Sequence, residues 1–176
     1  CDGDIDTTGV FSTDPPGGDD RNGDNITVTV KGPDGGIEVS DDRPGIFLDN
    51  GATIIIEGPN RPVSTTADGT PAIRVLNNAT ITVLGVVSTA GAEATGIQAG
   101  STAKIVIDGG ETSTTGESSN AITTGNGADI DLSGESKVST AGTDANAITA
   151  GTGSAIDLVG TSQVSTTGDR AHTIVI

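Results

Sequence analysis

Val138-Ser139-Thr140-Ala141 is one copy of a four-residue motif that recurs along most of this chain. The other copies are Val63-Ser64-Thr65-Thr66, Val87-Ser88-Thr89-Ala90, Thr112-Ser113-Thr114-Thr115 and Val164-Ser165-Thr166-Thr167, and a degenerate copy begins at Val39-Ser40. Successive copies begin 24, 24, 25, 26 and 26 residues apart. A period of this length indicates a repeat architecture, in which each unit buries its apolar face against the next.

Two further columns of aliphatic residues advance with the same period. The second column alternates apolar, variable and apolar residues, and the third column contributes one isoleucine to each repeat. The second column is Val28-Thr29-Val30, Ile54-Ile55-Ile56, Ile81-Thr82-Val83, Ile105-Val106-Ile107, Ile130-Asp131-Leu132 and Ile156-Asp157-Leu158; the third is Ile46, Ile73, Ile97, Ile122, Ile148 and Ile174. A period of two is the signature of a strand with one buried face, so each repeat contains three short strands.

Turn residues separate these strands, and we expect them to supply the positive φ angles that sharp corners require. They are Gly85, Gly109, Gly134 and Gly160 after the second column, and Asn50-Gly51 and Asn126-Gly127 before it. The sequence therefore predicts an all-β fold, a parallel β-helix (β-solenoid) with three short strands in each coil of 24 to 27 residues. About six coils over residues 26–176 would form a rod on the order of 30 Å long.

The period of two also predicts which side chains face inward. If Val63 and its equivalents point into the core, the Thr65 column points inward as well, and its hydroxyls bond to one another or to nearby backbone. Ser64 and Thr66, with their equivalents in the other repeats, then form a flat outward face of small hydroxyl and methyl groups. Such a face is typical of solenoids that bind ice, although Ser and Ala replace Thr at several of its positions.

The composition narrows the range of functions. The chain has 176 residues with 27 Gly, two Phe and no Trp, Tyr or Met, so its core is built from thin aliphatic layers. A formal net charge of −16 disfavours nucleic acids and anionic membranes as partners and leaves divalent cations as candidate ligands. No stretch approaches the roughly 20 apolar residues of a membrane span, so we expect no direct membrane insertion.

Runs such as Asn78-Ala79-Thr80-Ile81-Thr82-Val83 and residues 164–172 resemble autotransporter passenger domains. These are right-handed parallel β-helices that Gram-negative bacteria display on their surface, and the resemblance extends from about residue 26 to residue 176. It implies an extracellular, outer-membrane-associated stalk, adhesin or filament component. Its expected partners are other copies or a ligand on a host or neighbouring cell. Because Ile176 falls inside an expected strand, we expect the helix to continue, to a membrane anchor for example, or to be capped by another chain.

Residues 1–25 differ in composition and are predicted to be an acidic cap or linker. Asp2, Asp4 and Asp6 have the alternating oxygen spacing of a calcium loop, but the Gly and Glu expected at its sixth and twelfth positions are absent. Calcium is therefore an alternative cofactor and none is required. Cys1 resembles the acylated first residue of a lipoprotein; the other interpretation is that the numbering simply begins at a convenient residue.

We expect no catalysis. Asp131 and Asp157 occupy the outward middle position of consecutive repeats, and their carboxylates would lie about 5 Å apart, as in retaining glycosidases and in any stacked surface pair. We interpret them as a surface pair whose repulsion a cation relieves, and His172 as a corner residue. The alternatives to a structural role are a self-assembling calcium-dependent fibre, an ice-binding solenoid and a polysaccharide-processing β-helix enzyme.

Overall fold

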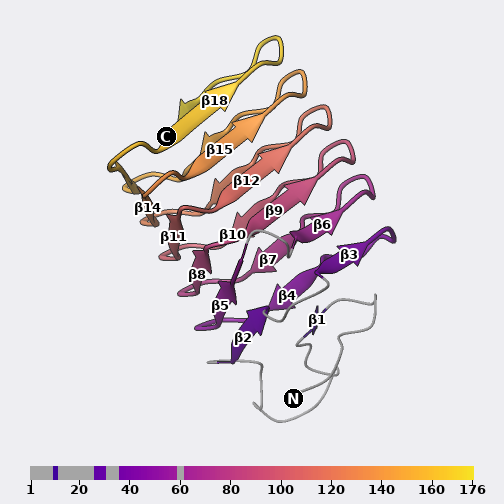
Figure 1. Cartoon of the computed structure of the whole chain (residues 1–176), viewed down its shortest axis with the longest axis vertical. Helices are drawn as coiled ribbons and strands as arrows, with labels where there is room; N and C mark the ends of the chain where they lie inside the picture. The colour runs from indigo at the N-terminus through magenta and orange to yellow at the C-terminus, as the bar shows by residue number, and fades with distance from the viewer. Residues whose placement is uncertain (1–9, 12–25, 31–35, 59–61) are drawn as a thin grey trace.

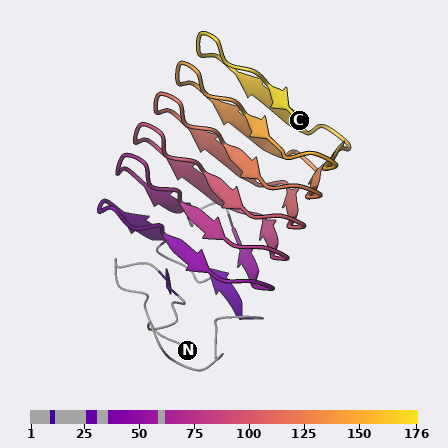
Figure 2. The ribbon, with the colours of Figure 1, turned by 180° about the vertical axis from the view of Figure 1, so that it is seen from behind.

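Runs of Ile, Val and Thr favour extended backbone, and the Gly, Asn or Asp residues at their ends turn the chain. A computed structural model describes residues 10–11, 26–30, 36–58 and 62–176. Within these ranges the runs form 19 strands and no helix, and the strands belong to three sheets whose pairs are all parallel. The prediction of an all-β parallel β-solenoid is confirmed. Figures 1 and 2 show the coils from opposite sides, stacked in chain order along one axis.

The chain visits the three sheets in turn. Sheet A contains β1 (Val10–Phe11), β4 (Ile46–Leu48), β7 (Ile73–Val75), β10 (Ile97–Ala99), β13 (Ile122–Thr124), β16 (Ile148–Thr149) and β19 (Ile174–Val175). Sheet B contains β2 (Thr27–Val30), β5 (Thr53–Ile56), β8 (Thr80–Val83), β11 (Lys104–Asp108), β14 (Asp129–Ser133) and β17 (Ala155–Leu158). Sheet C contains β3 (Ile37–Val39), β6 (Pro62–Thr65), β9 (Val86–Thr89), β12 (Glu111–Thr114), β15 (Lys137–Thr140) and β18 (Gln163–Thr166).

The sequence columns are the ladders of the three sheets. Ile73, Ile97 and Ile122 are Cα partners in sheet A, and the isoleucines of the second column pair in sheet B in the same way. In sheet C, Val87 pairs with Thr112, which in turn pairs with Val138. Buried side chains stack on their equivalents in the next coil. Residues that are one sequence repeat apart are therefore partners in the same ladder.

The register of the first coil differs from the prediction. Ile37, and not Val39, is the partner of Val63, and Val39 pairs with Thr65. The predicted alignment of Val39-Ser40 with Val63-Ser64 is therefore wrong by two residues. A shift of two leaves every side chain on the same face of the strand, so the alternation of apolar and polar residues could not reveal it.

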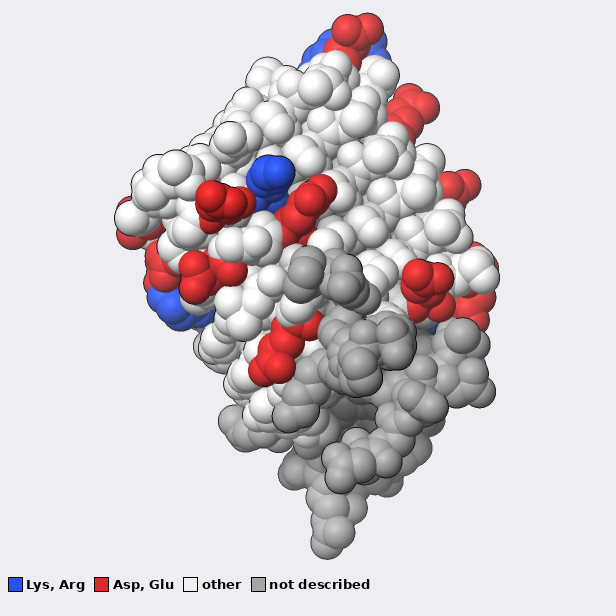
Figure 3. All heavy atoms as spheres, viewed as in Figure 1, with Lys and Arg blue, Asp and Glu red and all other residues white. Residues whose placement is uncertain are grey.

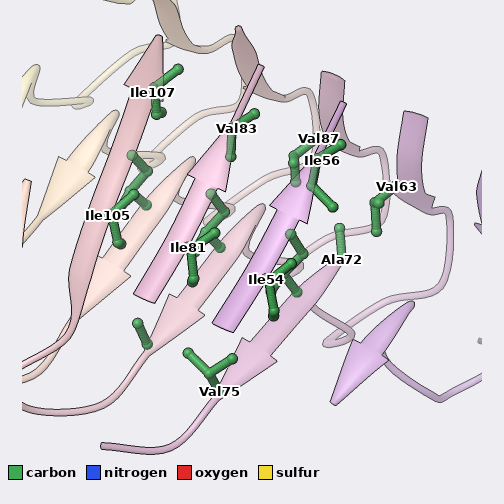
Figure 4. Close-up of a cluster of buried hydrophobic side chains, with 14 of the residues drawn as sticks. Ile54, Ile56, Val63, Ala72, Val75, Ile81, Val83, Val87, Ile105 and Ile107 are labelled. Carbon is green, nitrogen blue, oxygen red and sulfur yellow. The ribbon is translucent and has the colours of Figure 1, made fainter. Parts of the chain in front are cut away.

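Each complete coil directs six side chains into the core, two from each sheet. In coil β7–β9, for example, these include Ile73, Ile81 and Val87, which are all 0% exposed. Figure 4 shows aliphatic side chains of successive coils aligned above one another in this core. The last coil is covered on one side only, so Leu158 is 46% exposed although its ladder neighbour Leu132 is fully buried.

Differences in coil length are confined to one of the three corners. From coil β4–β6 onward, the first inward residue of sheet B follows the first inward residue of sheet A by eight positions, as Ile105 follows Ile97. The first inward residue of sheet A in turn follows the second inward residue of the preceding sheet C strand by eight positions, as Ile97 follows Thr89. The corner between sheets B and C varies, with four positions from Val83 to Val87 and seven from Ile56 to Val63. This corner therefore absorbs the variation in the repeat.

The glycines predicted at the corners use left-handed backbone with one exception, whereas Asn50 and Asn126 are not among the residues with positive φ. Gly51, Gly109, Gly127, Gly134 and Gly160 have φ between 66° and 74°. Gly85 does not belong to the positive-φ residues, so its predicted role is wrong. A Cβ at Gly85 would lie 2.4 Å from the carbonyl oxygen of Gly58, so this glycine is required by close packing between coils and not by its φ.

The acidic N-terminal segment contributes one described strand. Val10 and Phe11 form β1, which pairs in parallel with Ile46 and Phe47 of β4. The N-terminal end of sheet A thus carries an additional strand within the segment expected to be a cap or linker. Asp2, Asp4, Asp6 and Cys1 lie outside the described residues, and their predicted roles stay predictions.

Candidate functional site

The outer face of sheet C repeats the same kinds of side chain from coil to coil. Ser88, Ser113 and Ser139 are Cα partners in successive strands, and the positions two residues further on are exposed. Those exposed positions are Thr66, Ala90, Thr115, Ala141 and Thr167. Strands in one sheet lie about 4.8 Å apart, so this face presents rows of small hydroxyl and methyl groups at that spacing. The predicted outward orientation is confirmed.

The threonines between these outward positions are structural. Thr65, Thr89, Thr114 and Thr140 are at most 3% exposed. Each donates its hydroxyl to the backbone carbonyl five residues later in the following corner, at 2.5 to 2.8 Å. The sequence left two possible partners for these inward hydroxyls, one another or nearby backbone. The structure shows that they bond to the backbone. These bonds fasten sheet C to the corner that leads to sheet A.

A lysine joins two carboxylates on the outer face of sheet B. Lys104 Nζ lies 2.8 Å from Asp129 Oδ2 and 2.7 Å from Asp131 Oδ2. The hydrogen bond to Asp129, and then the one to Asp131, raises the pKa of Lys104 above its ordinary value of 10.5. Asp131 and Asp157 are Cα partners, as expected for a stacked surface pair. The cation beside Asp131 is thus the ammonium group of this chain.

This arrangement is suited to charge pairing. A retaining glycosidase needs two carboxylates that face a bound sugar, one of them able to donate a proton. Here Lys104 hydrogen-bonds both Asp129 and Asp131, and all three side chains are between 34% and 47% exposed. Within the described ranges, no three His, Cys, Asp or Glu side chains are grouped so that they could hold a metal ion.

Two further ion pairs lie at corners of the solenoid. Arg170 bonds Asp144 of the preceding coil, with its Nε 2.7 Å from Asp144 Oδ1, and this bond holds the pKa of the Asp144 carboxyl below its ordinary value. Arg43 hydrogen-bonds Asp41 within one corner and lowers the pKa of that carboxyl in the same way. The side chains of both pairs are exposed to solvent, and only the Arg170–Asp144 pair connects two coils.

His172 is exposed at a corner, as expected. Its backbone N–H donates to Asn146 Oδ1 at 2.9 Å, and the backbone N–H of Asn146 donates to Asn120 Oδ1 at 2.8 Å. The three residues occupy equivalent positions in successive coils, so asparagine side chains tie each corner to the next. In this position the backbone of His172 contributes a hydrogen bond that any residue other than proline could make.

An open depression of about 550 Å³ lies at the N-terminal end of sheet C. Its polar lining includes Glu38, Ser40, Asp41, Arg43 and Ser64. The carboxylate of Asp41 is engaged by Arg43, so the depression presents hydroxyls, the Glu38 carboxylate and one ion pair.

Sequence reasoning missed two groups of residues that determine how the coils fit together. Gly91, Gly116, Gly142 and Gly168 follow the Thr column by two positions, and a Cβ at any of the last three would lie within 2.0 Å of the preceding glycine's carbonyl oxygen. Their regular spacing was a signal that could have found them. The buried hydroxyls of Thr112 and Thr124 have no hydrogen-bond partner among the described residues, and no sequence signal marks them.

The outer surface is acidic, and its charges are interspersed with uncharged areas. Figure 3 shows acidic groups scattered over the face in view, with a broad area between them that carries neither charge. None of the described residues forms a helix that could cross a membrane. An acidic face of this kind repels anionic polymers and membranes.

No protein-family model matches this chain, and no match was found among curated proteins or solved structures. The class of protein is therefore defined by the geometry itself: the chain is a parallel β-solenoid with three sheets of six or seven strands. The resemblance to autotransporter passenger domains stays a prediction beyond the solenoid fold.

Proposed function

We propose that this chain is a structural segment of a secreted bacterial surface protein, a stalk, adhesin or filament component without catalytic activity. The observation that carries the proposal is the continuous register of the three sheets, with coil-length differences confined, from coil β4–β6 onward, to the corner between sheets B and C. A solenoid of this kind gains length by adding coils and keeps a constant cross-section. Both properties suit a part that holds other groups at a fixed distance from a surface.

The proposed location is extracellular, in association with a Gram-negative outer membrane. The resemblance in composition to autotransporter passengers supports this location, and the net charge of −16 is compatible with a soluble surface exposed to the medium. The proposed partners are other copies of the chain or a ligand on a neighbouring cell. Continuation into a membrane anchor would place the rod at the cell surface.

Electron microscopy of the purified chain, with and without millimolar calcium, tests the structural role. Single short rods support a stalk or adhesin segment, and rods that join end to end support a filament component. Joining that requires calcium would favour the calcium-dependent fibre, with Asp2, Asp4 and Asp6 as its first candidates. Compact particles without a long axis would contradict the proposal.

Surface display distinguishes an adhesin from a stalk. Residues 1–176 would be fused to a membrane-anchor domain on bacteria, and attachment to host and bacterial cells would be measured. The matched variant carries Ser88→Arg, Ser113→Arg and Ser139→Arg, which changes the outer face of sheet C and leaves the core intact. Attachment that disappears in this variant indicates an adhesive face. Attachment that is absent from both proteins indicates a stalk, and turnover of a polysaccharide would contradict the non-catalytic role.

Ice binding is a second candidate function, favoured by the rows of hydroxyl and methyl groups on sheet C. The regular Cα pairing of Ser88, Ser113 and Ser139 places these groups in a flat array. Thermal hysteresis of the purified chain tests this candidate, and the triple arginine variant is its control. Freezing-point depression equal to that of a non-binding protein of the same concentration would eliminate it.

A further inference from the structure

Three buried threonine hydroxyls have no hydrogen-bond partner among the described residues, and two of them flank one junction of the solenoid, the junction between coil β10–β12 and coil β13–β15; the third, that of Thr149, lies in β16. Thr112 is fully buried between Val87 and Val138 in sheet C. Thr124 is 7% exposed and is the ladder partner of Ala99 in sheet A. Neither Oγ1 atom has a hydrogen-bond partner among the described residues. A hydroxyl removed from water without a replacement bond destabilises the folded state, by roughly tenfold or more in the opening equilibrium.

The same junction has a thin aliphatic core. One inward column of sheet A reads Leu48, Val75, Ala99, Thr124 and Ala150 along the rod. The junction therefore stacks Ala99 on Thr124 in sheet A and Thr112 on Val138 in sheet C. At the junction of coil β4–β6 with coil β7–β9, the same two ladders stack Leu48 on Val75 and Val63 on Val87. Fewer buried methylene groups provide less hydrophobic stabilisation between coils.

Polar bridges cross this junction on the outside. Lys104 of β11 bonds Asp129 and Asp131 of β14, and Ser133 Oγ donates to Asp108 Oδ1 at 3.0 Å. These groups are exposed to solvent, so water and salt screen their attraction and their contribution is small. They do not replace the buried contacts that the core lacks at this level.

In a solenoid, each coil contacts only its neighbours, so the stability of the array is a sum of coil and junction contributions. We propose that the junction between coils β10–β12 and β13–β15 is the weakest internal junction, at which the rod opens first and divides into two cooperative units. The N-terminal unit, which includes β4–β12, stays folded while β13–β18 open. This inference is independent of the proposed function, since it depends only on core packing.

Native-state hydrogen exchange of the whole chain, followed by mass spectrometry at low urea concentrations, tests the proposal. Amides of β13–β15 are expected to exchange through an opening that leaves β4–β9 protected. Coil β13–β15 has a neighbour on both sides, so faster exchange there than in β4–β9 would not be explained by exposure at the end of the rod. The variant Thr112→Val/Thr124→Val should slow exchange in β13–β15 at least tenfold. Valine is compatible with position 112, because Val87 and Val138 occupy the same ladder.

Thr114→Val and Thr140→Val are the matched controls. Their hydroxyls donate to the carbonyls of Ser119 and Ala145, so the same substitution removes a bond and should accelerate exchange. Raising the salt concentration from 0.05 to 1 M should weaken the Lys104 bridges and lower protection of β13–β15 in the wild-type chain. Equal protection across all internal coils, or unchanged exchange in the double valine variant, would overturn the proposal.

Discussion

Gly116 illustrates how closely the coils approach one another at single residues. A Cβ at this position would lie 1.9 Å from the carbonyl oxygen of Gly91, a backbone atom that accepts a hydrogen bond from the Ser119 hydroxyl at 2.9 Å. Gly116→Ala should therefore force the two corners apart and destabilise the chain by about 3 kcal/mol, the upper range for overpacked positions. Urea unfolding followed by circular dichroism measures the change.

Gly69 provides the control for this prediction. Its φ of 66° lies in the left-handed region that Glu93, Ser118 and Asp144 also adopt at equivalent corners, with φ between 54° and 57°, and no atom lies within 4 Å of a Cβ added to Gly69. Gly69→Asn should cost no more than about 1 kcal/mol, because asparagine tolerates left-handed backbone. If both substitutions cost the same, close approach between coils is not the reason that Gly116 is a glycine.

The protonation state of Lys104 makes the stability of the folded chain depend on pH in the alkaline range. Its pKa in the folded chain is raised above 10.5 by Asp129 and then Asp131, so the stability that it contributes is fully present below pH 10.5. That contribution is lost as the pH rises through the higher pKa of the folded state. We expect the melting temperature of the wild-type chain to fall more steeply above pH 10.5 than that of Lys104→Met.

The carboxylates offer a reciprocal variant. Asp129→Asn/Asp131→Asn retains the lysine but removes both acceptors, so it should flatten the alkaline decrease as Lys104→Met does. Melting temperatures between pH 9 and 12 for the three proteins provide the comparison. An alkaline decrease that is as steep in both variants as in the wild-type chain would show that this network does not contribute.

At the scale of strands, the ladders could be predicted from sequence because each buried isoleucine stacks on its equivalent. Ile97, Ile122 and Ile148 gave the register of sheet A without any structural information. Shifts by two residues were not detectable, since Ile37 and Val39 face the same side of β3. The unpartnered hydroxyl of Thr112 was not detectable either, because the Thr column two residues further on has the same residue type and satisfied hydroxyls.

The outer-face geometry was predictable for the same reason, whereas the partners of its charged groups were not. Alternation placed Asp131 and Asp157 on the outside of consecutive coils, where the structure has them. The alignment of Lys104 with Asp129 follows from the same column, because each residue immediately precedes an aligned isoleucine, Ile105 or Ile130. That the ammonium group bonds both Asp129 and Asp131 depends on the side-chain rotamers, which the sequence does not determine.

The corners differ in their tolerance of added residues. The corner between sheets B and C already varies from four to seven positions, whereas the corner between sheets A and B holds eight positions from Ile46 to Ile54 and from Ile122 to Ile130. Two glycines inserted between Gly134 and Glu135 should change the free energy of unfolding by less than about 1 kcal/mol, because loop closure costs little per added residue.

The same insertion after Asn126 should be far more disruptive. The backbone N–H of Gly127 donates to Thr152 O in the next coil. In earlier coils, the corresponding bonds run from Thr102 N–H to Asn126 O and from Asn78 N–H to Ser101 O. Displacing this corner breaks the column of cross-coil bonds, and we expect a loss of several kcal/mol. Urea unfolding of both insertion variants checks the contrast, which equal losses would contradict.

For the whole molecule, charge controls association more than it controls the fold. The net charge is −16 at pH 7 and the sequence pI is about 4.1, so rods repel one another at neutral pH and lose that repulsion near pH 4. Light scattering should therefore rise steeply between pH 5 and 4 while circular dichroism retains its β signal. Arg170 holds the pKa of Asp144 below its ordinary value, and this pair contributes stability that is lost only as the pH falls through that lowered pKa. Association should consequently precede unfolding on acidification; loss of the β signal before scattering rises would show that acid acts on the coils themselves.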